Sequence, residues 1–273
     1  MHLEKATLLY NKPLGKNYFR LACNAAKIAN DAVPGQFVSV KINNTHEPFL
    51  RRPFGIHKVD GCRIEILYEA VGEGTRLLSK NKQGSFLDIL GPLGNGYDYR
   101  YALIRHKTPV LVAGGMGVAP LFFLAEKLVR SLGRKVRHSP RVLLGAKSKN
   151  QILCEKEFKK IGCSVTIATD NGSAGFKGKV TDLLKQTLST LDCPLSTALY
   201  ACGPRPMLAE VSRISRKHGI FTQVSLEEHM ACGIGACLGC VVKTKDGYKR
   251  VCKEGPVFNS EEIVWEKHTK GGR

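Results

Sequence analysis

One stretch near the carboxyl end decides how the rest of the chain is interpreted: Cys232-Gly-Ile-Gly-Ala-Cys237-Leu-Gly-Cys240, with Cys252 after a gap of eleven residues. The spacing C-x4-C-x2-C with a distant fourth cysteine is that of plant-type [2Fe–2S] proteins. Four thiolates must converge on two irons, and the glycines let backbone N–H groups turn toward the sulfur atoms. The sequence therefore predicts that these four cysteines bind one [2Fe–2S] cluster per chain.

A structural zinc site is the alternative interpretation. Zinc sites usually pair two C-x2-C knuckles, whereas this segment has one, from Cys237 to Cys240. A colourless protein with stoichiometric zinc would favour zinc, and a brown protein would favour the cluster. The other six cysteines are scattered singly, which is typical of small buried hydrophobic residues.

Composition narrows the class of protein. The chain has 273 residues, of which 43% are hydrophobic, enough for two compact domains and a small appendage. A net charge of +19 is compatible with nucleic-acid binding, but the basic residues are spread from Lys5 to Arg273 and no segment resembles a nucleic-acid module. We expect no nucleic-acid partner.

Neither an export signal nor a membrane span is expected. The longest uncharged run, residues 108–125, is interrupted by Pro109, Pro120 and three glycines, so it favours a strand, a turn and a helix start. The amino terminus has no long apolar run behind it. These observations favour a cytoplasmic protein that does not enter a membrane.

The first hundred residues predict a small β-barrel. Short runs rich in β-branched and aromatic residues, such as 37–42 and 63–68, are separated by turn signals such as Pro34-Gly35 and Asp60-Gly61. One helix is expected, near residues 74–78.

Residues 105–225 predict a doubly wound α/β domain. Buried strands are expected at 110–113, 141–145, 164–168 and 198–201. Helices are expected between them, near 119–132, 154–161, 180–189 and 205–218. Alternating strands and helices indicate a parallel sheet.

Two glycine turns in this domain are candidate nucleotide contacts. Gly114, Gly115 and Gly117 follow the first strand, and Cys202, Gly203 and Pro204 follow the last. Because ligands bind at the carboxyl ends of parallel strands, both turns are expected to face one crevice, with Cys202 near a nicotinamide. A plain tight turn and a buried core thiol are the alternatives. NAD and NADP are not distinguished, although Lys147 and Lys149 could contact a 2′-phosphate.

The order of motifs carries a resemblance. Arg52-Pro53-Phe54-Gly55, Gly72-Glu73-Gly74-Thr75, the glycine turn at 114–120 and Cys202-Gly-Pro-Arg-Pro-Met207 occur in the order typical of the ferredoxin–NADP reductase superfamily. Residues 225–237 and 249–258 narrow this, because they resemble the electron transfer subunit of type B dihydroorotate dehydrogenase. The resemblance extends from about Leu3 to Trp265. Taken alone, the first two motifs would be an exposed arginine and an ordinary helix cap.

The resemblance implies three domains: an FAD-binding β-barrel at 1–103, an NAD-binding α/β domain at 104–224 and a [2Fe–2S] domain at 225–273. One FAD per chain would be lined by Arg52, Pro53, Phe54, Gly55, Leu67, Tyr68 and Glu69, with Gly74 and Thr75 at its pyrophosphate. The family usually has serine where this chain has Gly55, and often arginine where it has His229. The last domain lacks the apolar mass for a conventional core, so we expect a covalent link or a metal to hold it together.

The resemblance also implies a function and a partner. Electrons would pass from the FMN of a dihydroorotate dehydrogenase catalytic subunit through the cluster and FAD to NAD+, in a heterotetramer with two copies of each subunit. The chain would have no dihydroorotate site of its own. An alternative partner is a hydrogenase or a ferredoxin-linked transhydrogenase, with the same cofactors.

Overall fold

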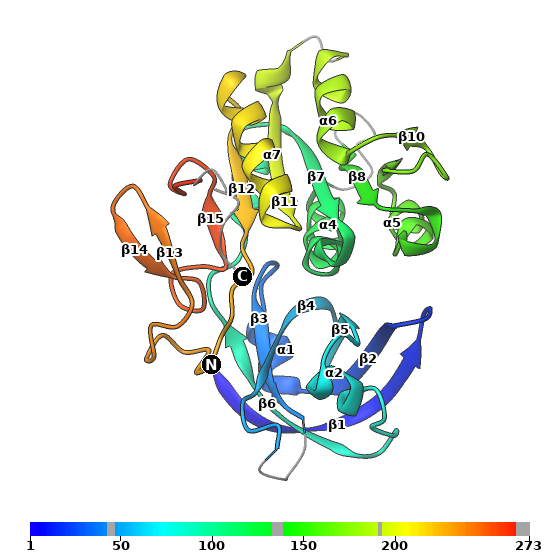
Figure 1. Ribbon diagram of the computed structural model, residues 1–273, viewed down its shortest axis with the longest axis vertical. Helices are drawn as coiled ribbons and strands as arrows, with labels where there is room; N and C mark the ends of the chain where they lie inside the picture. The colour runs from blue at the N-terminus through cyan, green and yellow to red at the C-terminus, as the bar shows by residue number, and fades with distance from the viewer. Residues whose placement is uncertain (43–46, 133–138, 191–192, 266–273) are drawn as a thin grey trace.

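The computed structural model describes residues 1–42, 47–132, 139–190 and 193–265. Figure 1 shows a barrel in its lower half, an α/β layer in its upper half and a small β-rich segment beside both. The chain passes from the barrel into the α/β layer after residue 93 and reaches the β-rich segment after residue 225.

The predicted barrel is confirmed as a closed barrel of six strands in the order β1-β2-β5-β4-β3-β6. The strands are β1 (His2–Pro13), β2 (Tyr18–Asn24), β3 (Phe37–Lys41), β4 (Arg52–Asp60), β5 (Arg63–Glu69) and β6 (Phe86–Leu93). Successive side chains of a strand point to opposite faces, which places Leu21, Ile66 and Ile89 in the core. The expected helix is α2 (Glu73–Leu78), and α1 (Ala26–Asp31) was not predicted.

The α/β part is a seven-stranded sheet in the order β10-β9-β8-β7-β11-β12-β15, parallel except at β15. Its strands are β7 (Thr108–Gly114), β8 (Arg141–Ala146), β9 (Ser164–Thr169), β10 (Phe176–Lys177), β11 (Thr197–Cys202), β12 (Thr222–Ser225) and β15 (Val257–Asn259). The four expected strands are all present, whereas β10, β12 and β15 were not predicted.

Helices cover both faces of this sheet, as a doubly wound fold requires. They are α3 (Arg100–Ile104), α4 (Val118–Leu132), α5 (Glu155–Lys160), α6 (Val180–Ser189) and α7 (Arg205–Lys217), with 3-10 turns η1 (Gly115–Gly117), η3 (Lys149–Gln151) and η4 (Pro194–Ser196). One core contains residues of α6 and α7, and the other contains residues of α3, α4 and α5. None of the helices in the described ranges is long and apolar enough to cross a membrane.

The cysteine-rich segment is not a self-contained unit. It forms a hairpin of β13 (Val241–Thr244) and β14 (Gly247–Arg250), and then β15 pairs antiparallel with β12. Val242, Val251 and Phe258 belong to the same core as α6 and α7. The expectation that a covalent link or a metal must hold this segment together was therefore wrong, because its apolar residues share a core with the α/β sheet. The domain boundaries at 103/104 and 224/225 stay predictions.

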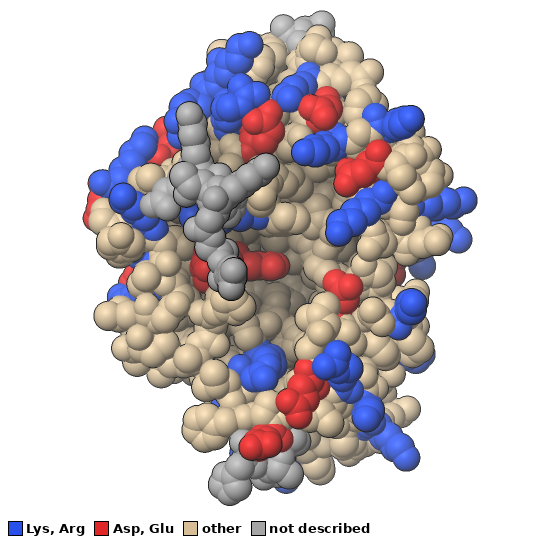
Figure 2. Space-filling model, in the orientation of Figure 1, with Lys and Arg blue, Asp and Glu red and all other residues tan. Residues whose placement is uncertain are grey.

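Helix α4 joins the α/β part to the barrel strand β4. His57 lies buried with Nδ1 2.9 Å from the carbonyl oxygen of Ala119, and its ring stacks on Phe122 with centroids 4.9 Å apart. Burial lowers the pKa of His57 to about 4, so this imidazole is neutral at pH 7. Nζ of Lys58, also in β4, lies 3.6 Å from the carboxylate of Glu126 in α4. Figure 2 shows a hollow between the two halves of the molecule.

Candidate functional site

The four predicted cluster cysteines lie together as two pairs. The side chain of Cys232 interacts with that of Cys237, and the side chain of Cys252 interacts with that of Cys240. A charge on Cys232 also raises the pKa of Cys252. In the described residues no three histidine, cysteine or carboxylate side chains converge as they would around a single metal ion. Two pairs of thiols suit a cluster of two irons, each of which takes two protein ligands.

Backbone N–H groups are directed at these thiols. The N–H groups of Ala236 and Cys237 point at Cys232 Sγ, 3.3 and 3.4 Å away, and that of Cys252 points at Cys240 Sγ, 3.4 Å away. Burial opposes ionisation of Cys232, but such donors outweigh it and lower the pKa of its thiol to about 6. Burial and the neighbouring Cys240 raise the pKa of Cys252 to about 12. The loop thus supplies the N–H donors that a thiolate-bound cluster requires.

The cysteine loop packs against the barrel. A Cβ atom at Gly233, where φ is +70°, would lie 3.6 Å from Oγ of Ser39 in β3. Ser39 in turn pairs with Pro53 of β4. On the other side of the loop, Asn95 donates a hydrogen bond of 2.9 Å to the carbonyl oxygen of Glu254. Sequence segments almost two hundred residues apart therefore place the cysteines beside the Arg52–Gly55 motif.

The predicted pyrophosphate residues also meet. The guanidinium of Arg52 lies over the backbone of Gly74, where a Cβ atom would be 2.9 Å from Arg52 Nε. The hydroxyl of Thr75 accepts hydrogen bonds from the N–H groups of Val71 and Gly72, at 3.0 and 3.1 Å. That hydroxyl therefore shapes the turn before α2, and an arginine suited to phosphate oxygens stands next to it.

Three other flavin candidates, Tyr68, Leu67 and Gly55, face different surroundings. Tyr68 is buried in the barrel core, with its hydroxyl donating to Asn11 Oδ1 over 3.0 Å, and burial raises the pKa of Tyr68 to about 12. Leu67 points the other way, into the core beneath α4. Gly55 faces Pro120, and a Cβ atom there would meet only ordinary contact at 3.5 Å. The family serine would therefore fit at position 55.

The two glycine turns of the α/β part pack directly on each other. A Cβ atom at Gly117 would lie 2.0 Å from the carbonyl oxygen of Cys202. A Cβ atom at Gly203, where φ is +155°, would lie 3.0 Å from the Cα of Gly114. The Cys202 side chain itself is 1% exposed, and burial raises the pKa of its thiol. Only the absence of side chains at these glycines permits such close approach.

A cavity of about 940 Å³ lies at the carboxyl ends of β7, β8, β9 and β11. Of the predicted nucleotide contacts, Gly114, Gly115 and Pro204 line it, whereas Gly117, Cys202 and Gly203 do not. Lys147 lines it and Lys149 does not. Its size and position suit a dinucleotide.

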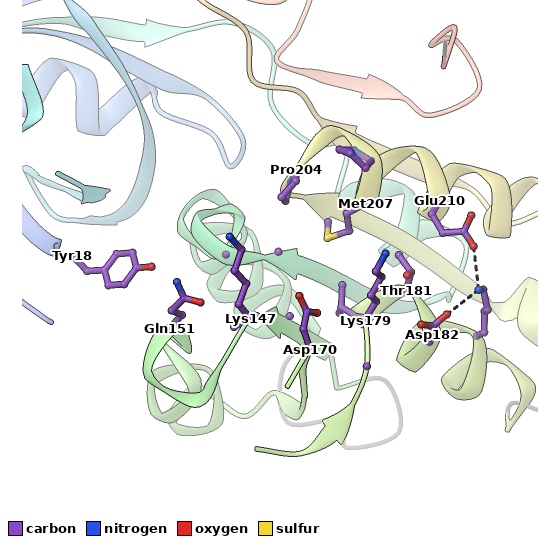
Figure 3. A pocket seen from close by; sticks show the side chains of 18 residues that line it. Tyr18, Lys147, Gln151, Asp170, Lys179, Thr181, Asp182, Pro204, Met207 and Glu210 are labelled. Carbon is purple, nitrogen blue, oxygen red and sulfur yellow. Dashed lines mark hydrogen bonds and ion pairs between the residues drawn. The ribbon is translucent and has the colours of Figure 1, made fainter. Parts of the chain in front are cut away.

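Sequence reasoning missed most of the other lining residues. Figure 3 shows Gln151, Asp170, Lys179, Met207 and Glu210 around this cavity. Asp170 comes directly after β9, so the rule that placed the glycine turns at this edge could have found it. Lys185 forms the ion pairs drawn in Figure 3, 2.9 Å from Asp182 and 3.1 Å from Glu210.

Two protein-family models match the chain. Residues 227–264 match the iron–sulfur cluster binding domain of dihydroorotate dehydrogenase B, and residues 111–213 match the oxidoreductase NAD-binding domain. The first match covers the four cysteines and favours the iron–sulfur interpretation over zinc.

Similar proteins cover nearly the whole chain. The dihydroorotate dehydrogenase B (NAD(+)) electron transfer subunit of Desulforamulus reducens is 41% identical over 92% of this chain and 94% of its own, and that of Geobacillus sp. is 39% identical over 97% and 99%. The structure of an NADH-dependent reduced ferredoxin-NADP oxidoreductase, described for flavin-based electron bifurcation, superposes with a TM-score of 0.81 at 28% identity, over 96% of this chain and 90% of that one. The chain therefore belongs to the family of dihydroorotate dehydrogenase B electron transfer subunits.

Proposed function

We propose that this chain carries electrons from the FMN of a dihydroorotate dehydrogenase catalytic subunit to NAD+, through one [2Fe–2S] cluster and one FAD, in de novo pyrimidine (UMP) biosynthesis. The contact of the cysteine loop with Ser39, the partner of Pro53 across β3 and β4, carries this proposal. It brings the cluster candidates next to the flavin candidates, and the cavity at 114–115 is lined by the α/β part together with Tyr18 of the barrel.

Each group of residues has a distinct proposed role. Cys232, Cys237, Cys240 and Cys252 hold the cluster, and the residues from Arg52 to Gly55, with Leu67–Glu69, Gly74 and Thr75, hold FAD. The two glycine turns hold the dinucleotide. When bound, the flavin exchanges a hydride with nicotinamide and single electrons with the cluster. The chain itself fixes the positions of these groups and excludes water from them.

The proposed partner is a catalytic subunit, in a cytoplasmic heterotetramer with two copies of each chain. Ten cysteines with no disulfide among them suit a reducing compartment. Dihydroorotate oxidation is proposed to take place in the partner and not in this chain.

The visible spectrum of the complex with its catalytic subunit tests the proposal. Flavin and cluster bands should bleach when dihydroorotate is added without oxygen and recover when NAD+ follows. Bands that respond to NADH but not to dihydroorotate would instead assign the chain to another partner, such as a ferredoxin-linked transhydrogenase. The similarity to the NADH-dependent reduced ferredoxin-NADP oxidoreductase, at 28% identity, suggests that alternative. Dihydroorotate oxidation by the isolated chain would contradict the proposal that this reaction takes place in the catalytic subunit.

Asp170 is expected to select NADH over NADPH. Its carboxylate lines the cavity directly after β9, where it would accept a hydrogen bond from a ribose hydroxyl and repel a 2′-phosphate. Replacing it, Asp170→Asn, should reduce the ratio of kcat/KM for NADH over NADPH by about tenfold. Steady-state reduction of ferricyanide with each nucleotide measures that ratio.

Asp182 provides the matched control. It lines the same cavity but is already paired with Lys185 at 2.9 Å, so Asp182→Asn should change the ratio much less. An equal effect of both variants would mean that net charge in the cavity, and not the position of Asp170, sets the preference.

Exposed apolar side chains surround the cysteines and mark the surface on which the catalytic subunit is proposed to dock. Leu238 is 60% exposed between Cys237 and Cys240, and Ile234 is exposed on the same loop. Val241 and Tyr248 are exposed on one face of the β13–β14 hairpin. Apolar side chains gathered in this way are typical of protein interfaces.

Leu238→Asp is therefore expected to weaken binding of the catalytic subunit by about tenfold or more. Leu238 has φ of +58°, a conformation that aspartate tolerates better than leucine, so the loop should keep its shape. Titrating the catalytic subunit and measuring dihydroorotate-dependent NAD+ reduction gives the affinity. Leu195→Asp, at another exposed leucine in η4, is the control and should have no effect.

A further inference from the structure

One barrel residue lines the dinucleotide cavity. Among the described lining residues, all but Tyr18 come from the α/β part of the chain, from Gly114 onward. Figure 3 shows the Tyr18 side chain directed from the barrel toward Gln151 and Lys147. The hydroxyl of Tyr18 interacts with the side chain of Gln151, and burial raises the pKa of Tyr18. The cavity is thus walled by both halves of the molecule.

The strand that carries Tyr18 has a second contact with the same wall. In β2, Phe19 and Leu21 point into the barrel core, so Tyr18 and Arg20 point outward. Arg20 Nη1 lies 2.6 Å from Glu157 Oε1 of α5, and Nη2 lies 3.6 Å from Sγ of Cys154, just before that helix. Tyr18 and Arg20, two outward-facing residues of β2, therefore both contact the segment 147–160, which follows β8.

The ion pair is partly shielded from water. The Arg20 side chain is 18% exposed and that of Glu157 is 36% exposed. Burial opposes ionisation of Glu157, but its hydrogen bond with Arg20 outweighs burial and lowers the pKa of the carboxyl. On its other side, α5 is anchored by Phe158, which is buried against Phe122 of α4. The segment is therefore attached to the barrel by Arg20 and to the α/β part by Phe158.

We propose that barrel strand β2 is part of the nicotinamide dinucleotide site, with Tyr18 contacting the dinucleotide and the Arg20–Glu157 pair positioning the wall formed by residues 147–151. This inference rests on the proposed function of the cavity and adds residues from outside the glycine turns. The Tyr18 ring offers an apolar face and its hydroxyl offers a hydrogen bond. Arg20 acts at a distance, by fixing the segment that carries Lys147 and Gln151.

Steady-state oxidation of NADH by the FAD-loaded protein, with ferricyanide as acceptor, tests both roles. Tyr18→Ala should raise KM for NADH by about fivefold or more, with kcat changed less than about twofold. Tyr18→Phe keeps the ring and should have a smaller effect. Arg20→Gln should also raise KM, and Arg20→Lys should restore part of the loss because a cation then remains near Glu157.

A double-mutant cycle on Arg20 and Glu157 distinguishes a positioning role of this ion pair from a general loss of structure. Glu157→Gln should raise KM as Arg20→Gln does, and the double variant should raise it no further, since both remove one interaction. Lys159→Gln is the matched control: Lys159 pairs with Glu155 at 2.6 Å on the same helix without reaching the barrel, so its loss should leave KM unchanged. FAD content, measured in every variant, should equal that of the unchanged protein.

Unchanged KM values in Tyr18→Ala and Glu157→Gln with full FAD content would overturn the inference. A fall in FAD content of Tyr18→Phe and Tyr18→Ala without a change in KM would also overturn it, by assigning β2 to flavin binding. Failure of the unchanged FAD-loaded protein to oxidise NADH would instead reject the proposed function. The three results are therefore distinguishable.

Discussion

Replacing Cys240 by alanine is expected to lower dihydroorotate-dependent reduction of NAD+ by about a hundredfold or more, while oxidation of NADH by ferricyanide is largely retained. Cys240 is 2% exposed and accepts the N–H of Cys252 at its sulfur. Its loss removes one of four proposed ligands from a site with no spare thiol on the loop. The flavin and the cavity at 114–115 are untouched, so hydride exchange with NADH should continue.

Both activities and the iron content should be measured on the complex with its catalytic subunit. Cys163→Ala is the control, because Cys163 is also a buried thiol but lies before β9, and it should keep iron and both activities. A Cys240→Ala protein with full iron content and normal dihydroorotate oxidation would show that the proposed ligand set is wrong.

The second large effect is expected from Gly117→Ala. Its new methyl group would lie 2.0 Å from the carbonyl oxygen of Cys202 and 2.7 Å from the nitrogen of Gly203. These are backbone atoms, so the two glycine turns must move apart. Because misplacement by about 1 Å can cost a hundredfold in rate, kcat/KM for NADH should fall by about ten- to a hundredfold.

Bound FAD should remain in this variant, since the atoms nearest the new methyl group belong to Cys202 and Gly203 of the α/β part. Gly61→Asn is the control: a Cβ atom there meets nothing within 4 Å, and asparagine tolerates its φ of +57°. Wild-type kcat/KM in Gly117→Ala would mean that the close approach of the turns has no part in nucleotide binding.

Local chemistry explains which features could be predicted from the sequence. The cysteine spacing and the glycines at 114–117 are short-range patterns with a direct physical purpose. The cysteines lie within the matched iron–sulfur domain, and Gly114 and Gly115 line the cavity. The strands at 110–113 and 198–201 were predictable because buried parallel strands are continuous apolar runs. Helix α1 has only six residues, too few for a periodic pattern to show.

What could not be predicted depends on contacts between distant segments. Tyr18 is one aromatic residue in a barrel strand, and nothing near it in the sequence indicates that it lines a cavity of the α/β part. Likewise, Cys202 stands directly before the Gly203–Pro204 turn, yet its side chain is buried in the core. Strand β15 has three residues, and only its pairing with β12 distinguishes it from a loop.

That pairing bears on how the holoprotein is assembled in the cell. Many small metal-binding domains fold only when the metal arrives. Here the cysteine loop is anchored at both ends, because the chain enters it from β12 and leaves it through β15, adjacent strands of one sheet, and because Val242 and Val251 are buried in that sheet's core. The polypeptide can therefore fold first and receive its iron and sulfide afterwards, so cluster delivery would be a late step in biogenesis that acts on a prepared frame.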